Sequence, residues 1–284
     1  MSDETKKFSN AFTVDLEDWY HGLTRTLATP ERWSSLPKRA ENTVPHLFDL
    51  LSNSGVRTTF FVLGDLAEKH PKLIKRISDQ GHELGSHGYS HRPVGQFSRK
   101  EFKKELEKSI AIIEQLTGIS PIGFRAPQFS INQKCTWAFE VLAETGFEYD
   151  SSVFPTRSLF YGYPGASRKP YKPLKNSDIV EYPVATTRIG KLTVPVAGGV
   201  YNRMLPYSII KWLMKRINQE EYPAVLYVHP WELDRKQPRI PVSFRERITH
   251  YGRRNTLDQK LKSLFLDFKF LPLGEVHRQW LSAN

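Results

Sequence analysis

The chain has 284 residues, of which 39% are hydrophobic and 25% charged. This composition is that of an ordinary globular protein and excludes a disordered chain. Lys and Arg outnumber Asp and Glu by 41 to 30, a net charge of +11 that attracts anionic groups such as a phosphorylated substrate. No zinc finger or RNA-recognition signature accompanies that charge, so we expect no nucleic-acid partner.

Membrane and secretion signals are also missing from the sequence. No run of about 18 apolar residues predicts a transmembrane segment, and the polar start lacks the apolar core of a signal peptide. We therefore expect a cytoplasmic protein with at most a weak association with membrane surfaces. The single cysteine, Cys135, excludes an internal disulfide. The sequence leaves the oligomeric state open.

Strand and helix patterns alternate along the chain. Apolar, β-prone runs predict strands at 8–14, 57–63, 82–85, 122–127, 147–153, 180–200 and 224–229, and near 268–273. Helical spacing predicts helices at 43–51, 66–80, 98–117, 132–145, 207–217 and 257–266, and from 274 onward. This order predicts an α/β fold with about seven mainly parallel strands, closed or nearly closed as a barrel.

Two segments depart from this alternation. Residues 154–204 form an insertion that begins with a long aromatic and basic loop, whose Phe160, Tyr161, Tyr163 and Tyr171 favour a lid or substrate wall. Residues 235–284 form a C-terminal extension. We expect all of 1–284 to be one catalytic domain.

Chemically capable side chains follow five of the predicted strands. Asp15 and Asp18 follow the first, and the others carry His87 and His91, then Arg125, Asp150 and His229. Barrel enzymes keep their active sites at the carboxyl ends of their strands. The shared position therefore predicts one active site built from all five.

The spacing His87-x-x-x-His91 is typical of metal ligands. Two imidazoles and one carboxylate leave coordination positions open for water and substrate, as in catalytic zinc and non-haem iron sites. We prefer Asp18 as the third ligand, because its shorter side chain can curl back at the start of a turn, and keep Glu17 as the alternative. We expect a divalent metal, zinc first, with Fe, Co, Mn or Ni also acceptable.

Three further residues complete a hydrolytic site. Asp15 would take the proton of a metal-bound water, and Arg125 would hold Asp15 ionised and oriented. His229 would protonate a departing amine. This set predicts hydrolysis of an amide at a metal.

The same residues resemble the five motifs of the polysaccharide deacetylases, carbohydrate esterase family 4. The motifs are similar to the segments Thr13-Val14-Asp15-Leu16-Glu17-Asp18, His87-Gly88-Tyr89-Ser90-His91, Arg125-Ala126-Pro127-Gln128-Phe129, Asp150-Ser151-Ser152-Val153-Phe154 and Leu226-Tyr227-Val228-His229. They occur in family order over residues 12–229. Residues 238–276 resemble the extra region of a subgroup associated with exopolysaccharide and O-antigen synthesis, whose first motif is Val-Asp-x-Glu-Asp.

The resemblance implies a distorted (β/α) barrel and N-deacetylation of a sugar in surface-polysaccharide assembly. It implies that Asp15 is the base and that a backbone N–H at or near Phe129 binds the oxyanion. Pro127, Phe129, Asp150, Trp19 and Trp231 are candidates for substrate contact, although each tryptophan could instead belong to the core. The substrate would be an N-acylated sugar, nucleotide-linked, lipid-linked or polymeric. Two alternatives are a hydrolase of N-formyl sugars, cyclic amides or ureides on the same fold, and a carbohydrate-binding protein without catalysis.

Overall fold

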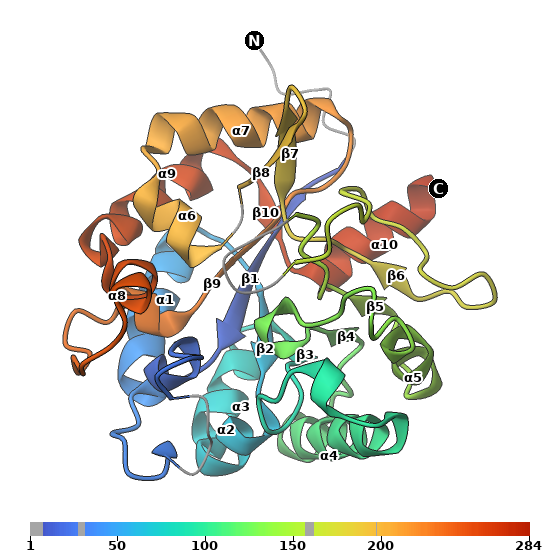
Figure 1. Ribbon diagram of the computed structural model, residues 1–284, viewed down its shortest axis with the longest axis horizontal. Helices are drawn as coiled ribbons and strands as arrows, with labels where there is room; N and C mark the ends of the chain where they lie inside the picture. Colours follow the sequence, from blue (N-terminus) through green and yellow to red (C-terminus); the bar gives the residue numbers. More distant parts are fainter. Residues whose placement is uncertain (1–7, 28–31, 157–161, 197) are drawn as a thin grey trace.

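The computed structural model describes residues 8–27, 32–156, 162–196 and 198–284. Phe160 and Tyr161, two aromatics of the expected substrate wall, lie outside these ranges. Seven parallel strands form a curled half-barrel, which confirms the expected α/β barrel (Figure 1). In spatial order they are β9 (Val225–Val228), β1 (Asn10–Leu16), β2 (Thr59–Val62), β3 (Glu83–Ser86), β4 (Gly123–Phe124), β5 (Tyr149–Asp150) and β6 (Val180–Glu181).

Strand β1 is the centre of this sheet. All seven of its residues are buried, and it pairs with β9 on one edge and with β2 on the other. The short strand β10 (Phe270–Leu271) pairs in parallel with the first residues of β1. After β6, the backbone N–H of Ala185 donates to the carbonyl of Val225 at 2.9 Å, which links this end of the sheet to β9.

Helices surround the strands (Figure 1). They are α1 (Ala40–Asn53), α2 (Gly64–Lys69), α3 (Pro71–Asp79), α4 (Arg99–Thr117), α5 (Ala138–Glu144), α6 (Gly199–Met204), α7 (Tyr207–Gln219), α8 (Phe244–Tyr251), α9 (Leu257–Asp267) and α10 (Leu273–Ala283). Short 3-10 helices are η1 (Trp19–Gly22), η3 (Val94–Gln96), η4 (Pro127–Phe129), η5 (Pro230–Leu233) and η6 (Arg254–Thr256). No helix among the described residues has the length and apolar character that crossing a bilayer requires.

Local sequence signals explain where several helices begin and end. Ser98 caps α4 and shares a capping box with Glu101, and Gly118 ends that helix in the left-handed conformation with φ 74°. The helix predicted over 66–80 is instead two helices, α2 and α3. Pro71 lacks an N–H and disfavours helical backbone at the residue before it, and His70 accordingly has φ −132° and ψ 55°.

The insertion and the C-terminal extension carry elements of their own. The insertion contributes β6, the antiparallel hairpin of β7 (Thr186–Ile189) and β8 (Leu192–Pro195), and α6. The extension contributes α8, which the sequence analysis did not predict, together with η6, α9, β10 and α10. Because β6 pairs with β5 and β10 pairs with β1, both segments join the central sheet.

Candidate metal and catalytic site

The alternation of side chains along a strand determines which face each acidic residue after Val14 occupies. Successive side chains of a strand point to opposite faces, so Asp15 and Glu17 share a face that Leu16 does not. Asp18 ends the extended segment and caps η1. Its Oδ1 accepts the backbone N–H of Trp19 at 3.3 Å and that of Arg39 at 2.8 Å.

Glu17 rather than Asp18 therefore lies beside the two histidines. Its Oε1 is 3.1 Å from His87 Nε2 and 2.8 Å from His91 Nε2. These three ligand atoms lie within 4.8 Å of one another, and all three residues are buried. This placement corrects our preference for Asp18, whose carboxylate is occupied by backbone N–H groups on the other side of the turn.

The donor set fits a divalent cation. His87 Nδ1 is 2.7 Å from the carbonyl oxygen of Arg125, which can only accept a hydrogen bond, so Nδ1 carries the proton. Nε2 and the carboxylate oxygen of Glu17 then face each other, and either a proton or a cation must lie between them. A cation between these atoms satisfies both, and a backbone carbonyl on the far nitrogen is the usual support of a metal-binding histidine.

Backbone strain places the second histidine. His91 has φ 60°, the left-handed region that non-glycine residues seldom adopt, and such strain is concentrated at functional sites. Gly88, three residues earlier, has φ 74° and makes the turn that brings His91 back toward His87.

Electrostatics keep Glu17 ionised. Burial alone would raise the pKa of Glu17, but the charges of His91 and His229 and the hydrogen bonds with both ligand histidines outweigh it. Together they hold that pKa well below its usual range. The carboxylate is thus available as an anionic ligand.

The predicted pair of Asp15 and Arg125 is formed and fully buried. Arg125 donates from one nitrogen to Asp15 Oδ1 and to the hydroxyl oxygen of Thr13, both at 2.7 Å. It also donates to the carbonyl and the hydroxyl of Ser151 at 3.0 and 2.9 Å. Asp15 Oδ1 is therefore fixed, and Oδ2 faces His229 Nε2 at 3.9 Å.

His229 follows β9 and faces both acids. Its Nε2 is 3.9 Å from Asp15 Oδ2 and 3.9 Å from Glu17 Oε2. Burial lowers the pKa of this imidazole, but the charges of Glu17, Glu232 and Asp15 and the hydrogen bond to Glu232 raise it to about 9. His229 consequently holds a proton at neutral pH, as a general acid must.

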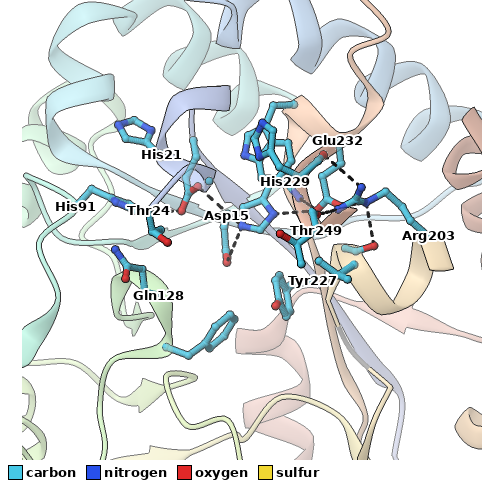
Figure 2. Close-up of a pocket in the computed structure, with 17 residues that line it drawn as sticks. Asp15, His21, Thr24, His91, Gln128, Arg203, Tyr227, His229, Glu232 and Thr249 are labelled. Carbon is cyan, nitrogen blue, oxygen red and sulfur yellow. Dashed lines mark hydrogen bonds and ion pairs between the residues drawn. The ribbon is translucent and has the colours of Figure 1, made fainter. Parts of the chain in front are cut away.

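A pocket opens over these residues (Figure 2). Asp15, Glu17, His91 and His229 line it together with residues of η1, α6, η5 and α8. The remaining lining residues are His21, Gly22, Thr24, Gln128, Phe129, Gly199, Val200, Arg203, Tyr227, Trp231, Glu232, Thr249 and His250.

Several lining residues escaped the sequence analysis, among them Glu232, Arg203 and His21. Glu232 and Arg203 form a buried ion pair against His229. His21 accepts the N–H of Asp18 at Nδ1 (3.0 Å), and burial lowers its pKa well below the usual range, so it is neutral and its Nε2 is a donor. The spacing His229-x-x-Glu232 was a usable signal for Glu232, whereas nothing local marks Arg203.

Of the five residues predicted to contact substrate, two line the pocket and three do not. Phe129 and Trp231 line the pocket, but the N–H of Phe129 donates to the carbonyl of Ala126 at 3.1 Å and is not free for an oxyanion. Trp19 is fully buried, with its indole N–H on the carbonyl of Pro37, so we assign it to the core. Asp150 is also fully buried, beside Glu181, and neither it nor the buried Pro127 lines the pocket.

Comparison with family models divides the chain in two. Residues 33–149 match the polysaccharide deacetylase family, and residues 151–278 match a domain of unknown function, DUF3473. The first match contains His87, His91 and Arg125, and the second contains His229, Glu232 and Arg203.

Curated relatives match somewhat more than a third of the chain. A peptidoglycan-N-acetylglucosamine deacetylase from Bacillus cereus is 36% identical over 97 residues, which are 34% of this chain and 35% of that protein. A peptidoglycan deacetylase from Helicobacter pylori is 34% identical over 110 residues, 39% of this chain and 36% of that protein. The matched segment spans about a third of the length of these relatives.

Solved structures share the fold over the full length. A putative polysaccharide deacetylase from Mycobacterium smegmatis matches with a TM-score of 0.66 and 22% identity, covering 100% of this chain and 93% of that one. An allantoinase, Puue, matches with a TM-score of 0.64 and 16% identity, covering 99% and 92%. Residues 33–149 are thus similar to the polysaccharide deacetylase family, and the whole chain shares its fold with solved structures that include a putative polysaccharide deacetylase and an allantoinase.

Proposed function

We propose that this protein is a metal-dependent hydrolase that removes an N-acetyl or similar small N-acyl group from a sugar. One observation carries the proposal. Glu17, His87 and His91 meet at one point, and His229 Nε2, which follows β9, lies 3.9 Å from Glu17 Oε2 and 3.9 Å from Asp15 Oδ2. The metal ligands, the base Asp15 and the acid His229 would therefore all reach the carbonyl group of one bound substrate.

Glu17, His87 and His91 would hold the cation, with zinc as the first candidate and Fe, Co, Mn or Ni as alternatives. When bound, such a metal lowers the pKa of its water and polarises the acyl carbonyl. Asp18 has no part in this set, because its carboxylate accepts two backbone N–H groups.

The protein's own residues would manage the protons. Asp15 Oδ2 accepts the proton of the attacking water, while the hydrogen bond from Arg125 keeps Oδ1 occupied. His229 Nε2 delivers a proton to the amine nitrogen as the carbon–nitrogen bond breaks. Asp15 is buried and the side chain of His229 is 18% exposed, so bulk water competes little for either proton.

The sugar class is supported by the relatives, two of which are named as peptidoglycan deacetylases. The resemblance of Val14-Asp15-Leu16-Glu17-Asp18 to the first motif of the exopolysaccharide- and O-antigen-associated subgroup supports a role in assembly of those polysaccharides instead. A panel of N-acetylated oligosaccharides, nucleotide sugars and lipid-linked sugars, assayed by acetate release, separates these substrates.

A second function is hydrolysis of a cyclic ureide, which the fold shared with an allantoinase favours. In this protein the reaction would use the same base and the same metal site but would release no acetate. Incubation with allantoin and with N-acetylglucosamine oligomers, followed by assays for ring opening and for acetate, discriminates the two.

Two variants test the assignment of roles. Asp15→Asn should lower turnover by about 10²–10⁴-fold, the usual contribution of a general base, with metal content near wild type. His87→Ala should lose both the metal and turnover. Equal metal content in the two variants, measured by elemental analysis after dialysis, would contradict the assignment.

A further inference from the structure

His229 is held by a buried network that lies entirely within residues 151–278, the region matched by a family of unknown function. We infer that Glu232 and Arg203 are positioning residues that fix the imidazole of His229 for proton delivery. The region would thereby complete the active site begun by residues 33–149. This inference rests on the proposed function for the role of His229, but the network itself is measurable without activity.

Glu232 holds the edge of the imidazole ring. Its Oε1 lies 2.8 Å from His229 Nδ1 and accepts the backbone N–H of His229 at 3.1 Å. The side chain of Glu232 is fully buried, and the burial cost of a carboxylate is large unless it is paired. Glu232 Oε1 thus bonds both the backbone and the ring of His229. These two hydrogen bonds fix the orientation of the ring, with Nε2 toward Asp15 and Glu17.

Arg203 supplies the compensating charge. Its Nε donates to Glu232 Oε2 at 2.7 Å and to the carbonyl of Gly199 at 3.1 Å. The guanidinium is 1% exposed, so the pair is shielded from water. Removing one partner of such a buried ion pair strongly destabilises the fold, because the other charge is left buried and unpaired.

The remaining donors of Arg203 anchor helix α8. They reach the carbonyls of Thr249, His250 and Gly252, the last at 2.6 Å. An arginine on the last carbonyls of a helix caps its C-terminus. Arg203 therefore joins the end of α8 to Glu232, and through Glu232 to His229 (Figure 2).

Aromatic stacking holds the face of the same imidazole. The ring of Trp231 lies 4.9 Å from that of His229 at an interplanar angle of 20°. His250, on α8, also stacks on Trp231, at 4.3 Å and 24°. The end of α8 thus restrains His229 by two routes, through Arg203 and through the stacked rings.

Gly199 makes room for this arrangement. A Cβ atom built there would lie 1.7 Å from Glu232 Oε2, far inside contact distance. Any side chain at this position would push Glu232 off both His229 and Arg203. The close approach explains a glycine at the first residue of α6.

The test compares Glu232→Gln and Arg203→Met with a matched pair in the same region. Arg168 and Glu220 form an ion pair with the same 2.7 Å distance, away from the pocket, so Glu220→Gln and Arg168→Met are the controls. In the metal-loaded enzyme we expect Glu232→Gln to lower kcat by about 10–100-fold, the usual cost of losing an orienting partner, with KM and metal content unchanged. The double variant of Glu232 and Arg203 should lose little more than Glu232→Gln alone, because both act through one ring.

A second readout needs no turnover. Nitrogen-15 NMR of His229 should show a hydrogen-bonded Nδ1 proton in the wild type that is lost or shifted in Glu232→Gln and retained in Glu220→Gln. A wild-type spectrum without that proton, or a Glu232→Gln enzyme within two-fold of wild-type kcat, would overturn the inference. If the wild type deacetylates no sugar but the NMR signals behave as expected, the proposed function fails and the positioning network stands.

Discussion

At the scale of single residues, charge around His229 decides its protonation. In the metal-free protein the nearby carboxylates raise the pKa of His229 to about 9, although burial opposes the shift. Because the folded pKa exceeds the unfolded value near 6.5, this proton contributes stability that is fully present below pH 6.5. The contribution is lost as the pH rises through about 9.

The corresponding prediction concerns metal binding. A divalent cation on Glu17 offsets one of the negative charges that face His229, so the pKa of His229 should fall when zinc is added. NMR titration of the ring with and without zinc measures both values. A metal-free pKa at or below 6.5, or no change on zinc addition, would contradict this account.

The choice between Glu17 and Asp18 also lies at this scale. The motif places both acids after β1 but does not say where the strand ends. The two-residue period of a strand puts Glu17 on the face of Asp15, and this signal was present in the sequence. The decisive facts, the cap on η1 and the N–H of Arg39, depend on a turn and on a residue 21 positions away.

At the scale of elements, β5 and β6 carry a buried acid pair that the sequence analysis assigned partly to substrate binding. Asp150 and Glu181 are neighbours across the two strands. Burial, together with the charge of Asp150 and a hydrogen bond donated to it, raises the pKa of Glu181 well above its usual range. Folding therefore favours the protonated form of Glu181, which also accepts the N–H of Val153 at 3.0 Å.

This pair predicts a pH-dependent stability. A carboxyl whose folded pKa is raised stabilises the fold below its unfolded pKa, 4.5, and loses that contribution as the pH rises toward its folded pKa. Glu181→Gln keeps the acceptor for Val153 but cannot ionise. Relative to this variant, the wild type should lose up to about 1.4 kcal/mol of unfolding free energy per pH unit above pH 4.5. Urea unfolding from pH 4.5 to 8 measures the difference, and parallel curves would refute it.

Elements differ in how far local sequence specifies them. Ser98 and Gly118 bound α4 as predicted, because capping acts within a few residues. The break between α2 and α3 was also readable, at Pro71, although the sequence analysis missed it. Helix α8 could not be predicted from its own sequence, because that basic sequence shows no clear apolar period. Its C-terminal end is fixed by Arg203, which lies outside the helix.

At the scale of the whole molecule, the site is assembled from four strands. Asp15, His87, Arg125 and His229 lie at the carboxyl ends of β1, β3, β4 and β9 or just beyond them, and parallel pairing brings those ends together. This is why a sequence pattern could predict the cluster. Glu232 and Arg203 escaped because their pairing depends on how α6 and α8 pack, which no motif recorded.

The most direct test of the account is zinc binding by Glu17→Gln and Asp18→Asn, measured by calorimetry on metal-free protein. Glutamine removes the anionic ligand of the cluster, whereas asparagine keeps an oxygen that can accept the N–H groups of Trp19 and Arg39. We predict that Glu17→Gln weakens zinc binding by at least about 10-fold and abolishes acetate release. Asp18→Asn should bind zinc within about two-fold of wild type, with any loss confined to stability. Wild-type zinc affinity in Glu17→Gln, or loss of zinc only in Asp18→Asn, would contradict the account.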